Sequence, residues 1–317
     1  MRNDMDRLAT IAAFVEVAER GSFADAARRL HRSPTAVTRA IAELESRLGV
    51  RLLSRTTRAV GLTNAGQGFL TGAKRVLADV DEIERSAAGQ GSAPRGELVV
   101  TAPILFGRLH VAPIVTAFLA QYPDVTARLV LLDRPIDLVT EGIDTAIRIG
   151  TLTDSSAIAT RVGELRRIVV AAPSYLDRRG TPSSIRDLAD HTLISFTGMA
   201  GVDRWQFVEP SGEVAVRIAP RLTVSTAEAA IDAAVSGFGI TRVLSYQAAD
   251  SLAAGLLARL LGRHDLDDLP VHVLYPGGRH SAPKLRAFVD FAVPRLRQRL
   301  AQVARVIADS GENLPRA

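Results

Sequence analysis

The sequence predicts a winged helix-turn-helix at the N-terminus, a long linker helix after it, and then an α/β region of two lobes. Three observations carry this prediction: two short helices and a basic hairpin between Gly21 and Arg58, an apolar stripe over about 65–88, and strands that alternate with helices from Glu97 onward. We expect a winged helix-turn-helix over 1–64, a linker helix and hinge over 65–92, an α/β region over 93–300, and a C-terminal tail over 301–317.

The first helix of the pair is predicted to begin after Ser22. This serine can cap the helix, and Asp25 stands at the position that completes a capping box. One apolar face then repeats at helical spacing, in Phe23, Ala26, Ala27 and Leu30.

The second helix is predicted to open with Ser33 as its cap and Pro34 at its first position, where proline is favoured. One of its faces is apolar and is expected to be buried, comprising Val37, Ile41, Leu44 and Leu48. The other face carries Thr35, Thr38 and Arg39, whose hydroxyls and guanidinium can bond base edges or phosphates. We therefore expect this helix to read a DNA major groove.

The segment RLLSRTTRAVGLT is predicted to form the hairpin, or wing, with Arg55, Thr56 and Arg58 near its tip. Arginine alone is weak evidence, because the whole chain has 39 basic residues and a net charge of only +5. Residues 1–65, however, hold 11 arginines against 7 acidic residues, so the charge excess lies mostly in this unit. The predicted DNA-binding set is Ser22, Ser33, Pro34, Thr35, Thr38, Arg39, Arg55, Thr56 and Arg58.

Thr63 is predicted to cap the long helix from about Ala65 to Ala88. Its apolar residues alternate steps of four and three, as in the seam of a coiled coil. They are predicted to pair two subunits: Phe69, Ala73, Val76, Val80, Ile83 and Ala87. The alternative is that the same stripe packs against the helix's own domain, because periodicity does not identify the partner surface. GQGSAPRG, residues 89–96, then reads as a linker.

In the α/β region we predict strands at ELVVTAP, TARLVLLD, DTAIRIG, RRIVVAAP, TLISF, VAVRIAPRLTV and PVHVLYP. Helices are expected at APIVTAFLAQYP, PIDLVTEG, TAEAAIDAAVSGFG and PKLRAFVDFAVPRLRQRL. Gly237-Phe238-Gly239 is expected to end a helix rather than to form a dinucleotide-binding loop.

The N-terminal pattern resembles that of the LysR-type transcriptional regulators. It comprises Ser22-Phe23, Ala26-Ala27, Leu30, Ser33, Ala36-Val37-Thr38, Ile41, Leu44-Glu45, Leu48-Gly49, Leu52-Leu53 and Arg55. Thr38 stands where the family has Ser, Leu53 where it has Phe, and Pro34-Thr35 where Gln-Pro is common. The second half is similar to the family's effector-binding domain, in TAPILFGRLHVAPIV, LLDRPIDLVTEGIDTAIRIG, VAAPSYL and STAEAAIDAAVSGFGI.

The resemblance implies a periplasmic-binding-protein-like fold with a ligand between two lobes. Lobe 1 would span about 93–163 and 270–300, lobe 2 about 164–269, with crossings near Arg161–Leu165 and Leu269–Val273. Effector contacts are then expected at strand ends and at a helix start: Thr101, Ala102, Pro103, Asp133, Ile149, Gly150, Thr197, Ser225 and Thr226. Free N–H groups at the start of the 225–227 helix would favour an organic anion, whereas helix capping explains Ser225 and Thr226 equally well.

Two other function classes are the alternatives to a regulator. The first is an enzyme on the α/β region. The sequence has no cysteine, no G-x-S-x-G nucleophile motif and no phosphate-binding loop, which argues against this class. A cytoplasmic solute receptor would leave the basic helix-turn-helix without a role. The six histidines show no metal-ligand spacing, so neither a metal nor a cofactor is expected.

The predicted protein is thus a cytoplasmic, ligand-responsive regulator and not an enzyme or a membrane protein. Its expected partners are double-stranded promoter DNA, a small-molecule effector and further copies of itself, as a homodimer and, by the resemblance, a homotetramer. RNA polymerase is expected as a further partner.

Overall fold

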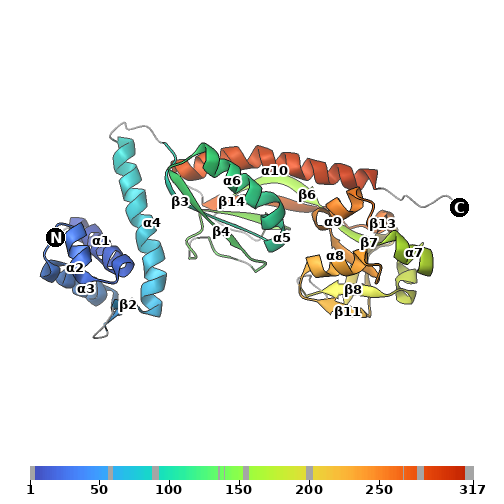
Figure 1. Cartoon of the computed structure of the whole chain (residues 1–317), viewed down its shortest axis with the longest axis horizontal. Helices are drawn as coiled ribbons and strands as arrows, with labels where there is room; N and C mark the ends of the chain where they lie inside the picture. The colour runs from blue at the N-terminus through green and yellow to red at the C-terminus, as the bar shows by residue number, and fades with distance from the viewer. Residues whose placement is uncertain are drawn as a thin grey trace. The chain divides into compact units, whose positions relative to one another are not determined.

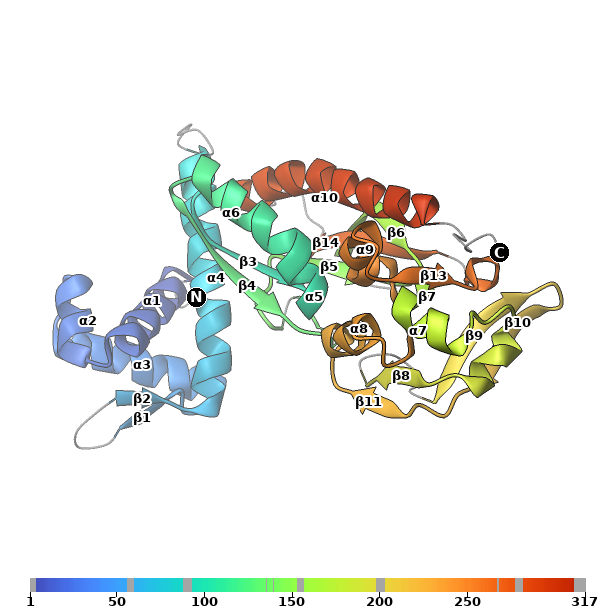
Figure 2. The same cartoon turned by 45° about the vertical axis from the view of Figure 1, so that its right-hand side comes forward.

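The computed structural model describes residues 4–55, 60–87, 93–134, 136–138, 140–152, 157–197, 203–266, 268–276 and 282–310 (Figures 1 and 2). The chain divides into two compact units, Met1–Ala93 with Asp137–Ile143, and Pro94–Ile136 with Asp144–Ala317.

The first unit is the expected winged helix-turn-helix followed by a long helix. Its helices are α1 (Asp4–Arg20), α2 (Phe23–Arg29), α3 (Pro34–Leu48) and α4 (Asn64–Ala87), and its strands are β1 (Leu53–Arg55) and β2 (Val60–Leu62). The two strands pair antiparallel, with Leu53 opposite Leu62. Helix α1 was not predicted, and its buried Phe14 and Val17 help to form the core of this unit.

The predicted helix starts are confirmed in their geometry. Ser22 Oγ accepts from the N–H of Asp25 at 3.2 Å, Ser33 Oγ from that of Ala36 at 3.2 Å, and Thr63 Oγ1 from that of Gly66 at 3.0 Å. The expected capping box at Ser22 is incomplete, because the Asp25 carboxylate pairs with the side chain of Arg28.

The buried face of α3 is shorter than predicted. Val37, Ala40, Ile41 and Leu44 are buried, whereas Leu48 is 41% exposed. The expectation for Leu48 was wrong because the helix stops there: Gly49 takes a left-handed φ of 69° and turns the chain toward the wing.

The second unit contains two five-stranded sheets, which confirms the two-lobed α/β fold. The first sheet has the order β4-β3-β5-β14-β6 and the second β11-β8-β12-β7-β13, while β9 and β10 form a separate hairpin. The strands are β3 (Gly96–Ala102), β4 (Val125–Leu131), β5 (Thr145–Ile149), β6 (Ala157–Leu165), β7 (Arg167–Ala171), β8 (Leu193–Phe196), β9 (Arg204–Glu209), β10 (Gly212–Arg217), β11 (Leu222–Val224), β12 (Ile240–Leu244), β13 (Ala258–Leu260) and β14 (Leu269–Pro276).

Helices flank both sheets. They are α5 (Ile104–Phe106), the π-helical η1 (Gly107–Val111), α6 (Ala112–Gln121), α7 (Pro173–Arg179), the 3₁₀ turn η2 (Ile185–Asp190), α8 (Ala227–Val235), α9 (Ser245–Ala253), the 3₁₀ turn η3 (Gly262–His264) and α10 (Pro283–Asp309). The helical stretch Ile104–Gln121 is long and apolar enough to cross a membrane by length and composition alone. Its Phe106, Val111 and Phe118 belong to the buried core of this unit, as expected of a core helix.

The chain passes between the two sheets twice. The first passage is the single residue Arg166 between β6 and β7, and the second runs from β13 through η3 to β14. The predicted crossings, near Arg161–Leu165 and near Leu269–Val273, lie directly beside these passages, since Arg166 follows the end of β6 and the second passage ends where β14 begins. The two segments themselves pair with each other in the first sheet.

Three further expectations need correction. The predicted helix PIDLVTEG is absent, since its described residues form turns. The predicted tail begins too early, because α10 continues to Asp309 with Val303 and Ile307 buried. The strand VAVRIAPRLTV is divided between β10 and β11.

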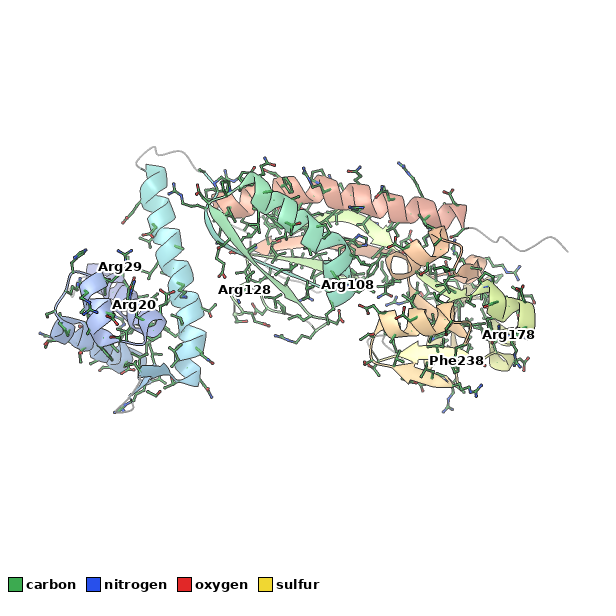
Figure 3. All side chains as sticks on the ribbon, viewed as in Figure 1. Arg20, Arg29, Arg108, Arg128, Arg178 and Phe238 are labelled. Atoms are coloured by element: carbon green, nitrogen blue, oxygen red, sulfur yellow. The ribbon has the colours of Figure 1, made fainter. Side chains whose placement is uncertain are left out.

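The end of α8 follows the prediction. Gly237 has a φ of 76°, and its carbonyl accepts from Arg178 Nη2 at 2.8 Å. Arg178 and the neighbouring Phe238 lie close together in Figure 3. A Cβ at Gly239 would lie 2.4 Å from the carbonyl oxygen of Thr192, so the backbone approach there requires glycine.

Candidate nucleic-acid interface and ligand site

The outer face of α3 gathers most of the residues predicted to contact DNA. Ser33, Pro34, Thr35 and Arg39 are exposed and Thr38 is half-buried, while the opposite face of the helix is buried in the core. No carboxylate pairs with the Arg39 guanidinium among the described residues. An exposed helix face with small polar side chains and one free cation has the shape and chemistry that a major groove accepts.

The hydroxyl groups of Ser22 and Ser33 are engaged in helix capping. Both side-chain oxygens cap helices, and Ser22 is half-buried. Each helix start also leaves backbone N–H groups that can bond a phosphate oxygen. These two residues therefore orient α2 and α3 and place helix N-termini at the surface.

The turn into the wing is held by a residue that the sequence analysis gave no role. Glu45 Oε1 accepts from the N–H of Leu52 at 2.7 Å and from that of Leu53 at 3.0 Å. Glu45 is part of the family pattern. An acidic residue shortly before the apolar segment Leu52-Leu53 was the signal in the sequence that could have indicated this role. For the predicted wing residues, Arg55 is described only by its backbone, while Thr56 and Arg58 lie outside the described residues.

The apolar stripe of α4 is divided between two environments. Phe69 lies against Phe14 of α1, with ring centroids 5.3 Å apart, and Ala73 is only 4% exposed. These two residues pack within their own unit, Phe69 against α1, which was not predicted. Their role as intersubunit residues stays a prediction. Val76, by contrast, is 44% exposed and Val80 is half-buried. The side chains of Ile83 and Ala87 lie outside the described set.

The first group of predicted effector residues follows β3. Thr101 is 1% exposed and its hydroxyl donates to the carbonyl of Val130 at 2.7 Å, so its polar group is already bonded. Ala102 is buried as well, whereas Pro103 is half-buried and Asp133 exposed. The Asp133 carboxylate accepts from the N–H of Ile104 at 3.0 Å and thereby connects the ends of β3 and β4.

The remaining predicted effector residues lie at other ends of strands and helices. Ile149 and Gly150 are half-buried at the end of β5, and Thr197 is exposed after β8. Ser225 and Thr226 are exposed before α8, and Thr226 Oγ1 accepts from the N–H of Ala229 at 3.3 Å. The structure therefore supports capping for Thr226, and Glu228 already places an acid in the first turn.

An aromatic cluster that the sequence analysis missed joins the two lobes. Phe106, His110 and Tyr246 contact one another, with ring centroids 4.8, 5.1 and 5.6 Å apart. Burial, followed by the charge of Arg299, lowers the pKa of His110 to about 4. Burial likewise raises the pKa of Tyr246. Phe106 and His110 are four residues apart, a spacing that places two side chains together on one helical face. The contact with Tyr246 could not be read from this spacing, because α9 lies far along the chain.

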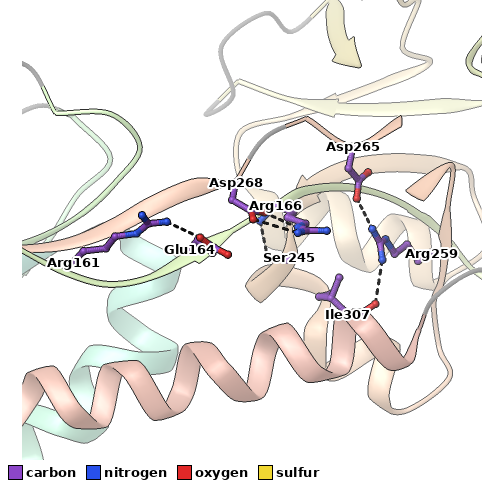
Figure 4. A network of polar contacts seen from close by, with 8 residues as sticks. All are labelled: Arg161, Glu164, Arg166, Ser245, Arg259, Asp265, Asp268 and Ile307. Carbon is purple, nitrogen blue, oxygen red and sulfur yellow. Dashed lines mark hydrogen bonds and ion pairs between the residues drawn. The ribbon is translucent and has the colours of Figure 1, made fainter. Parts of the chain in front are cut away.

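A polar network surrounds both passages between the sheets (Figure 4). The carbonyl of Arg166 accepts from the N–H of Ser245 at 2.7 Å, and Ser245 Oγ accepts from the N–H of Arg166 at 3.2 Å. The Arg166 guanidinium forms two hydrogen bonds with Asp268, at 2.5 and 3.2 Å. The first passage is thus bonded both to the start of α9 and to the second passage. Among the residues that the structure describes, no group of three or more acidic or histidine side chains could hold a metal ion.

Known proteins share this arrangement. The family model for the bacterial regulatory helix-turn-helix protein, lysR family, matches residues 8–67, and that for the LysR substrate binding domain matches residues 91–297. An HTH-type transcriptional regulator of Xanthomonas campestris pv. campestris is 34% identical over 89% of this chain and 83% of its own. An HTH-type transcriptional repressor of Pseudomonas aeruginosa is 34% identical, over 91% of this chain and 92% of its own.

Two solved structures have a similar fold over most of this chain. The LysR-type transcriptional regulator CrgA from Neisseria meningitidis has a TM-score of 0.59 and 32% identity, covering 93% of this chain and 99% of that one. The full-length Vibrio cholerae virulence activator AphB has a TM-score of 0.58 and 28% identity, covering 90% and 98%. The chain therefore belongs to the LysR family of transcriptional regulators, with a DNA-binding helix-turn-helix and an effector-binding α/β domain.

Proposed function

We propose that this regulator reads double-stranded promoter DNA through the exposed face of α3. The observation that carries the proposal is the placement of Arg39, Thr35 and Thr38 on one side of a helix whose other side is buried. Arg39 would bond a guanine edge or phosphate, and the threonines would bond base edges or backbone. The helix N-termini at Ser22 and Ser33, and the arginines of the wing, would bond phosphates.

The test is a nuclease-protection map of the purified full chain on promoter fragments, beginning with the region upstream of its own gene. Protection of paired half-sites about one helical turn apart, or a multiple of it, supports a dimeric reader. A chain that protects no fragment at any salt concentration would favour the alternative, a solute receptor without a DNA role.

The effector would be a small molecule bound between the lobes, at the ends of β3, β4 and β5 and the start of α8. Of the predicted contact residues, Pro103, Asp133, Thr197, Ser225 and Thr226 keep exposed or half-exposed side chains. The backbone N–H groups at the start of α8 favour an organic anion there. The protein binds this molecule without chemical change and so acts as a switch rather than as an enzyme.

Self-association would occur through the exposed part of the apolar stripe of α4, centred on Val76 and Val80. The interface would continue to Ile83 and Ala87. The exposure of Val76 supports this choice. Pairing would give a homodimer, with a homotetramer as the larger assembly, and RNA polymerase would be a further partner at the promoter. The place of action is the cytoplasm.

A further inference from the structure

Arg242 is a deeply buried cation in the second lobe. Its side chain extends from β12, and the residue is 4% exposed. One guanidinium nitrogen, Nη2, donates to the carbonyl of Gln206 at 2.6 Å, and the group lies 5.2 Å from the centre of the Phe207 ring. Its Nε has no hydrogen-bond partner.

A second arginine shares the same face of the sheet. In the antiparallel pair of β7 and β12, Leu244 lies opposite Arg167 and Arg242 opposite Val169. Residues opposite each other, and residues two apart on one strand, point to the same face, so Arg167 and Arg242 are diagonal neighbours within reach of each other. Burial, and secondly the charge of Arg167, lowers the pKa of Arg242 to about 10; burial also lowers the pKa of Arg167. Their other neighbours on this face include the fully buried Val169.

The same lobe shows how a buried arginine is ordinarily neutralised. Arg259 donates to the Asp265 carboxylate at 2.6 Å and to the carbonyl of Ile307 at 3.1 Å (Figure 4). Within the described part of the chain, no carboxylate lies at ion-pair distance from either Arg167 or Arg242. The lobe thus holds two adjacent guanidinium groups without a carboxylate at ion-pair distance. The charge of Asp265, which is bonded to Arg259, acts on Arg242 only from farther away.

A buried charge without a counterion is costly, and buried arginines are normally paired. We propose that Arg167 and Arg242 form a binding site for a small oxyanion of the carboxylate or phosphate class. The planar guanidinium group matches the paired oxygens of such anions, and Arg242 Nε is a donor still available to them. Trp205 Nε1 is a second buried donor without a partner, on the strand that also carries Phe207. Arg167 is only half-buried, so the anion would enter from its side.

None of these residues is among the proposed DNA and effector contacts, so the site can be tested independently of them. Trp205 is the only tryptophan of the chain and its ring centre lies 6.5 Å from that of Phe207, so its fluorescence reports on this lobe. Inorganic phosphate and, separately, acetate should be titrated into the full chain, with chloride added to hold the ionic strength constant.

We expect one of the two anions to change the Trp205 emission saturably. At ten times its Kd it should also raise the Tm of the second unit by about 3–6 °C. Arg242→Met should weaken binding at least tenfold and abolish the Tm rise, whereas Arg217→Gln, an exposed arginine of the same lobe, should leave both unchanged.

The two arms separate the sources of the anion: a response to phosphate alone indicates a phosphate ligand, and a response to acetate alone indicates a carboxylate. If Arg242→Met does not fold, the half-buried Arg167→Gln carries the same test. A response equal to that of chloride, or one that both arginine variants retain, would overturn the proposal.

Discussion

The ring of Phe69 in α4 meets the ring of Phe14 in α1 nearly edge-on, with an interplanar angle of 67°. Close by, Lys74 of α4 pairs with Glu19 of α1 at 2.5 Å. These contacts make one face of the first half of α4 part of the winged helix-turn-helix core, whereas Val76, farther along α4, is exposed and available to a second subunit.

Val76→Glu should therefore dissociate the dimer. A carboxylate at the centre of the proposed seam would be buried without a partner against its symmetry mate. Sedimentation velocity should show the variant as a monomer with a normal Tm. Ala78→Glu adds the same charge at an exposed position two residues on, about 200° around the helix, and should leave the dimer intact. An intact Val76→Glu dimer would place the interface elsewhere.

Gly66→Ala should destabilise the first unit without acting on association directly. A Cβ at this position would lie 2.0 Å from the carbonyl oxygen of Leu52, which is backbone and cannot move aside easily. We expect a loss of about 2 kcal/mol or more in the free energy of unfolding, measured in urea. Gly68→Ala, which meets nothing within 4 Å, is the matched control and should be neutral or slightly stabilising. Equal stability of the two variants would contradict the close approach.

Arg39→Ala should relax sequence preference at one base pair per half-site. The expected loss is about 1–3 kcal/mol for the preferred sequence, with little change for unrelated DNA. Arg20→Ala removes the same charge from α1, where the guanidinium is already paired with Glu16, and should alter neither the affinity nor the preference. Binding-site selection on random duplexes would measure both, and an unchanged profile for Arg39→Ala would remove its proposed role.

His110 should make the second unit less stable in acid. Its pKa is lowered from 6.5 to about 4 in the folded chain, chiefly by burial, so the unfolded chain binds a proton first as the pH falls. Stability is full above about pH 6.5, falls between about pH 6.5 and 4, and the total loss is at most about 3 kcal/mol. His110→Gln should lack this part of the loss. Urea unfolding of both proteins across this range gives the difference directly, since shared titrations cancel, and parallel curves would contradict the prediction.

Thr226→Val should cost about 1 kcal/mol of stability by removing the cap of α8, and Thr226→Ser should restore it. If the hydroxyl also contacts the effector, Val should weaken effector binding more than a lost cap explains while effector-free DNA binding stays unchanged. A thermal-shift screen of organic acids identifies the ligand. Equal stabilisation of the wild type and Thr226→Val by the best hit would move the effector away from this helix start.

The sequence predicted most of the recognition unit because its signals are local. Ser22, Ser33 and Thr63 cap helices through bonds to residues three positions on, a relationship visible in the order of residues. Local patterns could not show that Phe69 packs against Phe14 of α1, because that contact depends on tertiary packing. For the same reason the sequence indicated a passage near Arg161–Leu165 but not the pairing of β6 with β14, which follows more than a hundred residues later.

The candidate sites likewise contain features that local sequence patterns predict and features that depend on tertiary packing. The exposed face of α3 follows from helical periodicity, whereas the bonding of Thr101 to Val130 depends on which strand lies beside β3. The cluster of Phe106, His110 and Tyr246 needed the apposition of two lobes, because only the pair Phe106 and His110 has a helical spacing. That Arg167 and Arg242 are neighbours on one face of the sheet depends on the register of β7 and β12, which local patterns do not show.

The passage of the chain through the single residue Arg166 limits how the two sheets can move. Any rotation of one sheet against the other must change the backbone torsions at or next to this residue, and Ser245 holds both its N–H and its carbonyl. A small rotation would strain these bonds without breaking them, while a large one would exchange them for other partners. Motion between the lobes should therefore take place as a jump between a few discrete angles, and an effector would select one of those angles rather than tune a continuous range.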